Sequence, residues 1–364
     1  MALSRPLLQR WLRQHRARIG GWGALLGGAG VAAVGLVPLC LTSPPVRAQE
    51  QTVGVYSGRH YNTDQALYRR FTAQTGIRVT LLEGKDDALI ERLRTEGRNS
   101  PADVLVLVDA ARLTKAADLG LFQPIRSTTL LRDVPVTLRD SRQRWFALTR
   151  RVRLLILDPR QVRPGSIRTY ADLARPDLRG KVCLRDSRSV YNQSLVADQL
   201  ILRGAGATQT WLKGMMANLN PRQPFFTSDT PLVRAVGRGD CGVALVNSYY
   251  VARMLAGEQG AADRALAQRL RVVFPDPAHV NISGAGVTRT SRNPAAAARL
   301  LEFLASPSGG RGYAEANHEY PLVGFGGNPV LKRLGSFRAD GVPAELLGAR
   351  NRQAVQLMQA SGWR

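Results

Sequence analysis

Tyrosines at the ends of predicted strands are the residues of this sequence whose type and spacing point most directly to chemistry. Tyr61, Tyr191 and the adjacent pair Tyr249 and Tyr250 are four of the nine tyrosines, and each follows a short apolar run predicted as a strand. Connections of this kind are usually built from Gly, Ser, Asp and Asn. A hard, highly charged cation prefers oxygen ligands and can hold phenols as phenolates well below their ordinary pKa of about 10. The pattern therefore predicts a site for a trivalent ion, of which ferric iron is the commonest biological example.

The neighbouring residues strengthen this interpretation. His60 adds an imidazole nitrogen beside Tyr61. Tyr249 and Tyr250 would face opposite ways within a strand, but at a strand-to-helix corner the backbone turns and both rings can approach one point. Taken singly, a tyrosine here is an aromatic at the edge of the core with its hydroxyl in water, and a histidine is an ordinary polar contact. Taken together, the set favours metal ligation.

The elements that must position these side chains alternate between strands and helices, which predicts parallel sheets covered by helices. The predicted strands are residues 52–56, 77–82, 103–108, 153–157, 181–184, 242–246 and 270–274. The helices predicted in the second half of the chain are residues 193–202, 208–218, 294–304 and 350–360. Ligands of open α/β sheets bind outside the carboxyl ends of the strands, where the tyrosines lie.

The first 48 residues have the pattern of an export signal. Five arginines lie between Arg5 and Arg18, residues 19–42 carry no charge, and no Asp or Glu precedes Ala48. A basic stretch followed by an apolar stretch is typical of a secretory signal peptide, and cleavage after Ala48 would make residue 49 the mature start. The uncharged run also approaches the roughly 20 residues of a spanning helix, so an uncleaved membrane anchor is the alternative. Both interpretations predict a periplasmic location for the remaining chain.

The composition excludes some classes of partner. The chain carries a formal charge of +24 and keeps +18 without its first 48 residues, since six arginines and no acidic residue lie within them. A basic surplus often indicates nucleic acid, an anionic membrane surface or acidic ligands. The arginines here are spread along the whole length, so a solvated basic surface is expected and nucleic-acid binding is not. The remaining 316 residues suffice for two domains of about 150 residues each, and a monomer is expected.

Two cysteines remain after the export signal, and an oxidising compartment favours their pairing. Cys183 lies in the predicted strand 181–184, and Cys241 directly precedes the predicted strand 242–246. Two neighbouring parallel strands would bring these positions together, so a disulfide between Cys183 and Cys241 is predicted.

Six segments of the sequence carry a further signal. They are residues 55–64, 100–105, 191–196, 247–250, 279–284 and 319–322. Together, and in this order, they resemble the ferric-iron-binding periplasmic proteins, especially those of the cyanobacterial type. Arg-His-Tyr-Asn at residues 59–62 and Ser-Tyr-Tyr at residues 248–250 are the most specific parts of the resemblance.

The resemblance implies the periplasmic binding protein type II fold, in which two α/β lobes joined by crossing hinge strands close on Fe(III). Residues 49–152 and 280–325 are then expected to form lobe 1, and residues 153–279 and 326–364 lobe 2. It also implies iron ligands in both lobes. These are His60 and Tyr61 in lobe 1, and Tyr191, Tyr249 and Tyr250 in lobe 2.

Some members of that family use an acidic ligand after the strand matching residues 104–107, together with an exogenous anion. The matching position here is Val108, and Asp109 would face the other way, so neither is expected to bind the ion. Arg151 matches an arginine behind the iron site, where its charge would offset surplus phenolate charge; a surface position is the alternative. His279 and His318 fall in matching segments and are expected to be structural.

The resemblance implies a solute-binding protein that delivers iron to an inner-membrane ABC permease with its ATPase. Catalysis is not expected, because no histidine lies in a nucleophile–base pattern and no glycine-rich phosphate loop follows a strand. One alternative is a protein that binds an oxyanion or small organic anion through tyrosine hydroxyls. Another is a basic envelope-surface protein that binds polyanions without a metal.

Overall fold

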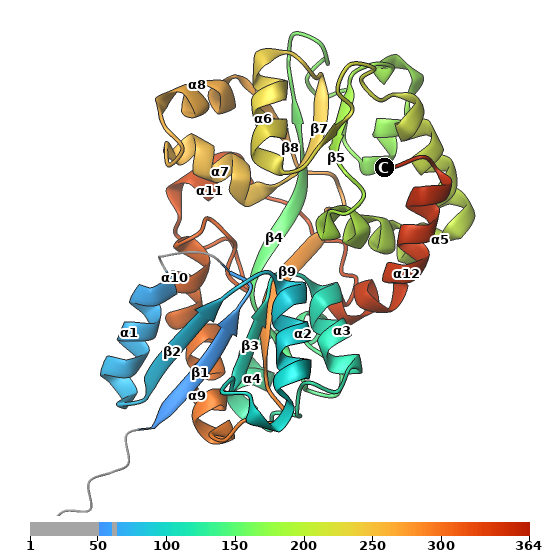
Figure 1. Cartoon of the computed structure of the whole chain (residues 1–364). Helices are drawn as coiled ribbons and strands as arrows, with labels where there is room; N and C mark the ends of the chain where they lie inside the picture. The colour runs from blue at the N-terminus through green and yellow to red at the C-terminus, as the bar shows by residue number, and fades with distance from the viewer. Residues whose placement is uncertain (1–50, 60–63) are drawn as a thin grey trace, which may run out of the picture. The chain divides into compact units, whose positions relative to one another are not determined.

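The apolar runs of the sequence form a mixed sheet in the computed structural model, which describes residues 51–59 and 64–364 (Figure 1). Within these residues the sheet has nine strands in the order β2-β1-β3-β9-β4-β7-β5-β6, and β8 pairs with β4. The strands are β1 (Thr52–Ser57), β2 (Arg78–Glu83), β3 (Val104–Leu107), β4 (Phe146–Leu157), β5 (Val182–Arg185), β6 (Phe225–Phe226), β7 (Val243–Asn247), β8 (Arg271–Val273) and β9 (Val280–Val287).

Helices cover both faces of this sheet (Figure 1). Those of the amino-terminal half are α1 (Asp64–Thr75), α2 (Asp86–Glu96), α3 (Ala110–Asp118) and α4 (Thr128–Asp133). The later ones are α5 (Val190–Ala217), α6 (Asp229–Arg238), α7 (Ser248–Ala256), α8 (Ala261–Arg269), α9 (Pro294–Ala305), α10 (Gly309–Glu315), α11 (Pro329–Leu334) and α12 (Ala344–Ala360). Helix α5 is interrupted at Gly204, whose φ of 77° lies in the left-handed region that glycine adopts without steric cost.

Strands β4 and β9 connect two α/β lobes (Figure 1). The first half of β4, residues 146–152, pairs antiparallel with β9 beside β1 and β3. Its second half, residues 153–157, pairs antiparallel with β7 and β8. The apolar pattern of the sequence predicted only this second half as a strand, whereas residues 149–153 were expected to belong to a hinge strand from the family resemblance. The structure joins both parts in one strand, residues 146–157, that runs from one lobe into the other.

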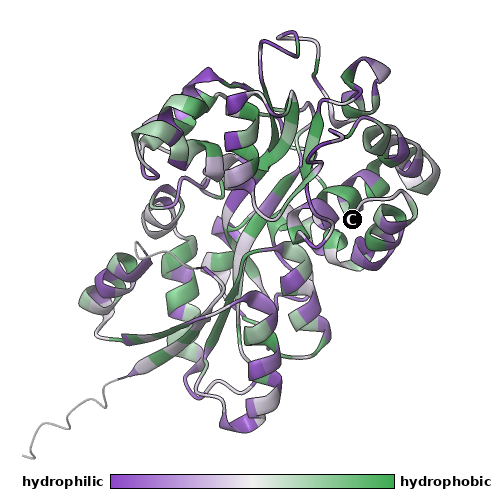
Figure 2. Cartoon of the chain, turned by 45° about the horizontal axis from the view of Figure 1, so that its top comes forward, coloured by the Kyte–Doolittle hydropathy of each residue, from purple (hydrophilic) through white to green (hydrophobic). Residues whose placement is uncertain are grey.

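Each lobe has its own buried core. The core of the first lobe includes Val55 and Val106 from the sheet and Leu300 from α9. In the second lobe alternate residues of β7 face opposite sides of the sheet, as the period of a strand requires. Ala244 and Val246 contribute to one core, and Val243 and Leu245 to the other. The interior strands are accordingly coloured mainly as hydrophobic in Figure 2.

The carboxyl-terminal helix α12 contributes to both lobes. Leu347 belongs to the core of the first lobe, whereas Met358, and Trp363 just after the helix, belong to a core of the second. The described residues form one compact unit, Gln49–Arg364, and the predicted lobe boundaries within it stay a prediction. None of the helices among the described residues is long and apolar enough to cross a bilayer. The predicted export signal, residues 1–48, lies outside the described residues.

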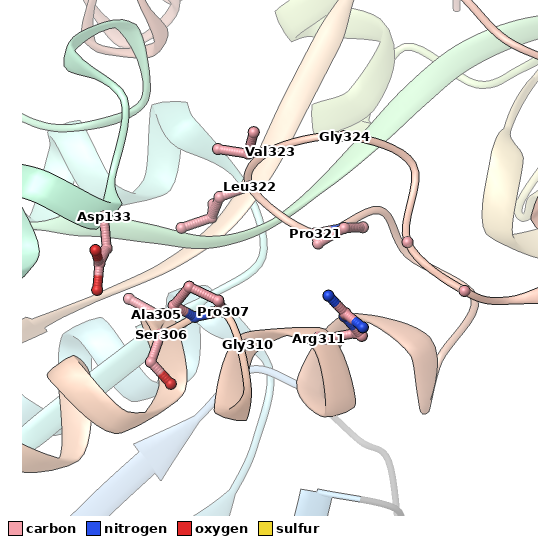
Figure 3. Close-up of a pocket in the computed structure, with 12 residues that line it drawn as sticks. Asp133, Ala305, Ser306, Pro307, Gly310, Arg311, Pro321, Leu322, Val323 and Gly324 are labelled. Carbon is pink, nitrogen blue, oxygen red and sulfur yellow. The ribbon is translucent and has the colours of Figure 1, made fainter.

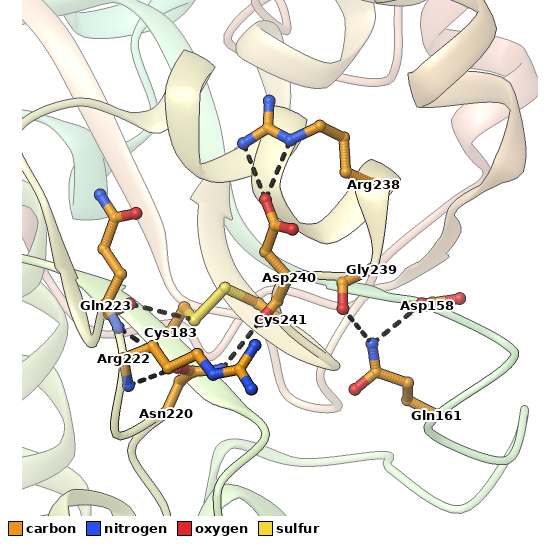
Figure 4. Close-up of a disulfide and its surroundings, with 10 residues drawn as sticks. All are labelled: Asp158, Gln161, Cys183, Asn220, Arg222, Gln223, Arg238, Gly239, Asp240 and Cys241. Atoms are coloured by element: carbon orange, nitrogen blue, oxygen red, sulfur yellow. Dashed lines mark hydrogen bonds and ion pairs between the residues drawn. A yellow bond between two sulfur atoms is a disulfide. The ribbon is translucent and has the colours of Figure 1, made fainter.

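A disulfide joins Cys183 of β5 to Cys241, which precedes β7 (Figure 4). The two strands are parallel neighbours, with Val182 opposite Val243. Next to the disulfide, the Asn220 side chain donates to the carbonyl oxygen of Asp240 (2.8 Å). The covalent bond and this hydrogen bond hold the starts of both strands whose far ends carry the tyrosines.

Replacing Cys183 and Cys241 together by Ser should lower the free energy of unfolding by about 2–4 kcal/mol, because the bond closes a long loop in the unfolded chain. The two cysteines are 58 residues apart. Urea denaturation of both proteins, with and without a thiol reductant, measures the difference. Reductant should destabilise the wild type and leave the variant unchanged; equal stability of the two oxidised proteins would contradict the prediction.

Candidate metal centre

Three of the predicted ligands come from the carboxyl ends of neighbouring strands. Tyr191 lies in the first turn of α5, shortly after β5, and Tyr249 and Tyr250 lie in the first turn of α7, directly after β7. Because β5 and β7 are parallel and adjacent, both helix starts lie at the same edge of the sheet. The strand-to-helix turn places consecutive residues side by side, as the sequence analysis expected of this pair.

The phenol groups lie close enough to share one ion. The hydroxyl oxygens of Tyr191 and Tyr249 are 3.4 Å apart. The rings of Tyr249 and Tyr250 lie 4.4 Å apart between centroids at an angle of 30°. Tyr249 is 3 % exposed, whereas Tyr191 and Tyr250 are half-buried and accessible to a solute. Two oxygens at this separation can both contact an ion at the usual metal–oxygen distance of about 2.0–2.2 Å.

Two guanidinium groups lie next to Tyr191. Those of Arg151 and Arg185 are 5.0 and 5.3 Å from the centre of its ring. Burial opposes the charge of Arg151, but attraction to Tyr191, Glu319 and Asp109 outweighs it and raises the pKa of this arginine. Burial also opposes the charge of Arg185, and attraction to Asp229 and the tyrosines again raises its pKa. Both arginines are therefore charged, and they offset negative charge that phenolates would bring.

A buried ion-pair network positions the two helix starts. Asp229, at the start of α6, accepts hydrogen bonds from Arg153 Nη1 and from the backbone N–H of Asn247, both at 2.9 Å. Arg153 Nη2 donates to Asn192 Oδ1 (2.6 Å), next to Tyr191. One carboxylate thus links the end of β7 to the start of α5 through a hinge-strand arginine. No role was predicted from the sequence for Arg153, Arg185 or Asp229, although Arg185 directly follows the predicted strand 181–184.

Asp109 lies in the interior and links the two lobes. Its carboxylate accepts hydrogen bonds from Ser194 Oγ of α5 (3.0 Å) and from Asn281 Nδ2 of β9 (2.8 Å). Arg151 Nη2 lies 3.8 Å from the same group. Burial raises the pKa of Asp109, and the Arg151 charge opposes that shift. Asp109 therefore supports the hinge behind the tyrosines.

An acidic side chain, that of Asp86, lies at the strand ends of the first lobe, at the start of α2 rather than after β3. Asp86 Oδ2 accepts a hydrogen bond from the backbone N–H of Val108 (3.2 Å). A Cβ at Gly58 would lie 1.6 Å from Asp86 Oδ1, so the glycine makes room for this carboxylate. Burial raises the pKa of Asp86 to about 6. From the sequence, an acidic ligand was considered only after residues 104–107, so Asp86 was not predicted.

The other two predicted ligands, His60 and Tyr61, lie outside the described residues, whereas the residues on both sides of them are described. Arg59 is 1 % exposed, and its Nε donates to Asp64 Oδ2 (2.9 Å). Arg59 Nη1 donates to Glu319 and to Thr149 Oγ1 of β4 (3.3 Å). An ion-pair network therefore fixes Arg59 and Asp64 to each other and to the hinge.

Two further histidines, His279 and His318, lie in the described part of the chain, and both lie beside acidic side chains. His318 Nε2 contacts Glu258 Oε1 (2.6 Å), and its Nδ1 contacts Asn328 (2.9 Å). His279 is buried beside Asp198 and Asp340.

A pocket of ~370 Å³ beside α9 and α10 contains two charged side chains, Asp133 and Arg311, among mostly glycine, proline and apolar residues (Figure 3). This pocket offers no set of oxygen ligands like that of the tyrosines.

The sequence matches the family model described as bacterial extracellular solute-binding protein over residues 56–315. It is 41 % identical to iron uptake protein A1 of Synechocystis over 321 residues, which cover 87 % of this chain and 88 % of that protein. It is 30 % identical to the major ferric iron-binding protein of Neisseria meningitidis over 277 residues, covering 74 % and 80 % of the two chains.

Solved structures agree with these similarities. A Trichodesmium FutA protein in complex with iron and citrate superposes with a TM-score of 0.82 at 40 % identity, covering 86 % of this chain and all of that one. The ferric binding protein of Campylobacter jejuni superposes with a TM-score of 0.78 at 30 % identity over 86 % of this chain and all of that one.

Proposed function

This chain belongs to the bacterial extracellular solute-binding protein family, and we propose that it captures ferric iron in the periplasm and delivers it to an ABC-type iron importer. The observation that carries the proposal is the convergence of Tyr191, Tyr249 and Tyr250 at one sheet edge, with two of their hydroxyls 3.4 Å apart. The fold class predicted from the sequence, the periplasmic binding protein type II fold, is confirmed by the solved structures.

The proposed iron site takes ligands from both lobes. Tyr191, Tyr249 and Tyr250 belong to the second lobe, and His60 and Tyr61 complete the set from the first. Phenolates suit Fe(III) because a hard trivalent ion stabilises the charged form of the oxygen. Up to four phenolates would give the site excess negative charge, which Arg151 and Arg185 offset. Closure of the lobes follows from binding, because only the closed state offers all ligands to one ion.

The remaining assignments follow from this role. Residues 1–48 act as the export signal, cleaved or retained as an anchor, and the rest works as a monomer in the periplasm. The relatives are named as iron uptake and ferric iron-binding proteins, which supports binding and transfer of the ion without catalysis. The partner is an inner-membrane permease with its ATPase, and the iron is cargo rather than a resident cofactor.

Metal loading separates the iron proposal from the anion alternative. Protein freed of metal with a chelator is incubated with ferric citrate, or with citrate, phosphate or sulfate alone, and then desalted. The proposal predicts about one iron per chain after ferric citrate and a raised Tm, because a ligand that binds only the native state stabilises it. A raised Tm with the anions alone, and no retained iron, would favour the anion alternative.

A further inference from the structure

A second group of metal-ligating side chains includes none of the tyrosines of the candidate iron site. Asp198 comes from α5, His279 immediately precedes β9, and Asp340 lies between α11 and α12. One ligating atom of each residue lies within 4.8 Å of those of the other two. The backbone holds two of these segments together, since Asp340 N–H donates to the carbonyl oxygen of Ala278 (3.0 Å) and Ala278 N–H to that of Arg338 (2.8 Å). Three distant parts of the chain therefore meet in a fixed arrangement.

The ligating atoms are buried and lack hydrogen-bond partners. The side chains of Asp198, His279 and Asp340 are 0 %, 2 % and 4 % exposed. Asp198 Oδ2 accepts from Gln199 (3.0 Å) and Asp340 Oδ1 from the backbone of Val342 (2.9 Å), which fixes both carboxylates. Their other oxygens, and both ring nitrogens of His279, make no hydrogen bond. Buried polar atoms are satisfied in the great majority of cases, so this cluster needs a further partner.

The distances fit a coordinated ion better than a hydrogen-bonded ion pair. His279 Nδ1 lies 3.4 Å from Asp198 Oδ1 and 3.8 Å from Asp340 Oδ2. A charge-assisted N–H···O hydrogen bond would be about 2.7–2.9 Å long. Ligands about 2.0–2.2 Å from a tetrahedral metal ion are about 3.3–3.6 Å from one another. The separation of 3.4 Å lies within this range, that of 3.8 Å is slightly above it, and all three ligating atoms lie within 4.8 Å of one another.

The charge of the cluster also favours binding of a cation. Within the described part of the chain, His279 is the only basic side chain within ion-pair distance of either carboxylate. With both carboxylates ionised, a protonated histidine would neutralise only one of their two charges, and uncompensated buried charge is costly. A divalent ion would neutralise both. One imidazole nitrogen and two carboxylate oxygens are ligands that Zn²⁺ and similar divalent first-row metals accept.

We propose that Asp198, His279 and Asp340 bind a divalent transition-metal ion of the zinc class, with water in the fourth position. This ion is distinct from the transported iron, since its ligands include none of the tyrosines. It ties α5, which carries Tyr191, to the start of hinge strand β9 and to the segment before α12. The bound ion would therefore stabilise the packing of these three segments against one another.

Zinc retention tests this site separately from the cleft. Chelator-treated wild type, the Tyr249→Phe/Tyr250→Phe variant, His279→Gln and Asp340→Asn are equilibrated with micromolar Zn²⁺, desalted and analysed for metal. We expect about one zinc in the first two proteins, and affinity lowered by at least about 10-fold in the last two. His318→Gln, which removes another histidine paired with a carboxylate, should keep the zinc. Zinc should also raise the Tm of the wild type and not that of His279→Gln.

Cobalt gives a readout that does not depend on the folding of any variant. Co²⁺ bound to the wild type should show the intense visible d–d bands of tetrahedral coordination, and zinc should displace it. The proposal is overturned if the wild type retains no zinc and shows no such bands. It is equally overturned if His279→Gln binds zinc as the wild type does, or if only the tyrosine variant loses it, because the metal would then lie elsewhere.

Discussion

Replacing Tyr249 and Tyr250 together by Phe should abolish retention of ferric iron. The substitution removes two hydroxyl groups from the first turn of α7 and keeps both rings, which stack 4.4 Å apart. Loss of a group that merely orients a metal ligand costs about 10–100-fold in affinity, so the loss of two ligands should exceed about 100-fold. Competition with citrate, followed by desalting and iron analysis, measures the change.

Tyr320→Phe is the matched control for this variant. Tyr320 is buried against Phe325 and Phe337, and its hydroxyl makes no hydrogen bond among the described residues, so its loss should leave iron binding unchanged. Circular dichroism and Tm should be close to those of the wild type in both variants without iron. If the Tyr249→Phe/Tyr250→Phe variant bound iron as tightly as the wild type, Tyr249 and Tyr250 could not be iron ligands.

Replacing Arg59 by Met should destabilise the first lobe by about 3–5 kcal/mol, because Asp64 and Glu319 would be left as buried charges without their partner. Arg59 is fully buried, donates to both carboxylates, and its guanidinium lies 4.0 Å from the centre of the Tyr313 ring. Attraction to these groups outweighs burial and raises the pKa of Arg59. Urea denaturation measures the loss. Iron affinity should fall as well, because the residues flanking His60 and Tyr61 lose their mutual anchor.

Two comparisons identify the cause of that loss. Arg92→Met removes an exposed arginine paired with Glu96 and should have no measurable effect on stability. Adding Asp64→Asn and Glu319→Gln to Arg59→Met removes the stranded charges and should recover part of the stability. If Arg59→Met were as stable as the wild type, the buried network would not be what fixes Arg59 and Asp64 on either side of the first-lobe ligands.

The sequence was sufficient to predict the strands that are buried and continuous in hydrophobicity. Residues 103–108 form a near-unbroken apolar run, and β3 lies there. Strand β9 was not predicted, because Asn281, Ser283, Gly284 and Gly286 break any apolar pattern. The structure supplies the reason for one of these residues. A Cβ at Gly286 would lie 2.5 Å from the Phe122 ring and 2.6 Å from a carbonyl oxygen, so tertiary packing rather than strand propensity selects glycine.

The polar residues of β9 also serve the hinge. Asn281 donates to Asp109 (2.8 Å), and Ser283 accepts from Arg151 Nη1 (3.1 Å). Such contacts join residues more than 130 positions apart, and no local pattern predicts them. The same limit explains why Asp229 was missed and why His279 was interpreted as structural without its two carboxylate neighbours.

The tyrosines, in contrast, could be predicted because their positions do not depend on long-range contacts. Their position depends on two local facts, a strand end and the start of a helix, which the sequence displays directly for Tyr191 and for Tyr249 and Tyr250. The chemistry of phenols then suggests the ion. Whether the hydroxyls converge depends on β5 and β7 being neighbours, which only the three-dimensional structure establishes.

Binding of ferric iron by tyrosinates of this chain can be detected in a visible absorption spectrum. Purified wild-type protein freed of metal is titrated with ferric citrate, with citrate alone as the blank. We expect a broad tyrosinate-to-iron charge-transfer band that grows until about one iron per chain has been added and persists after desalting. A protein that stays colourless and retains no iron would show that the tyrosines do not bind ferric iron.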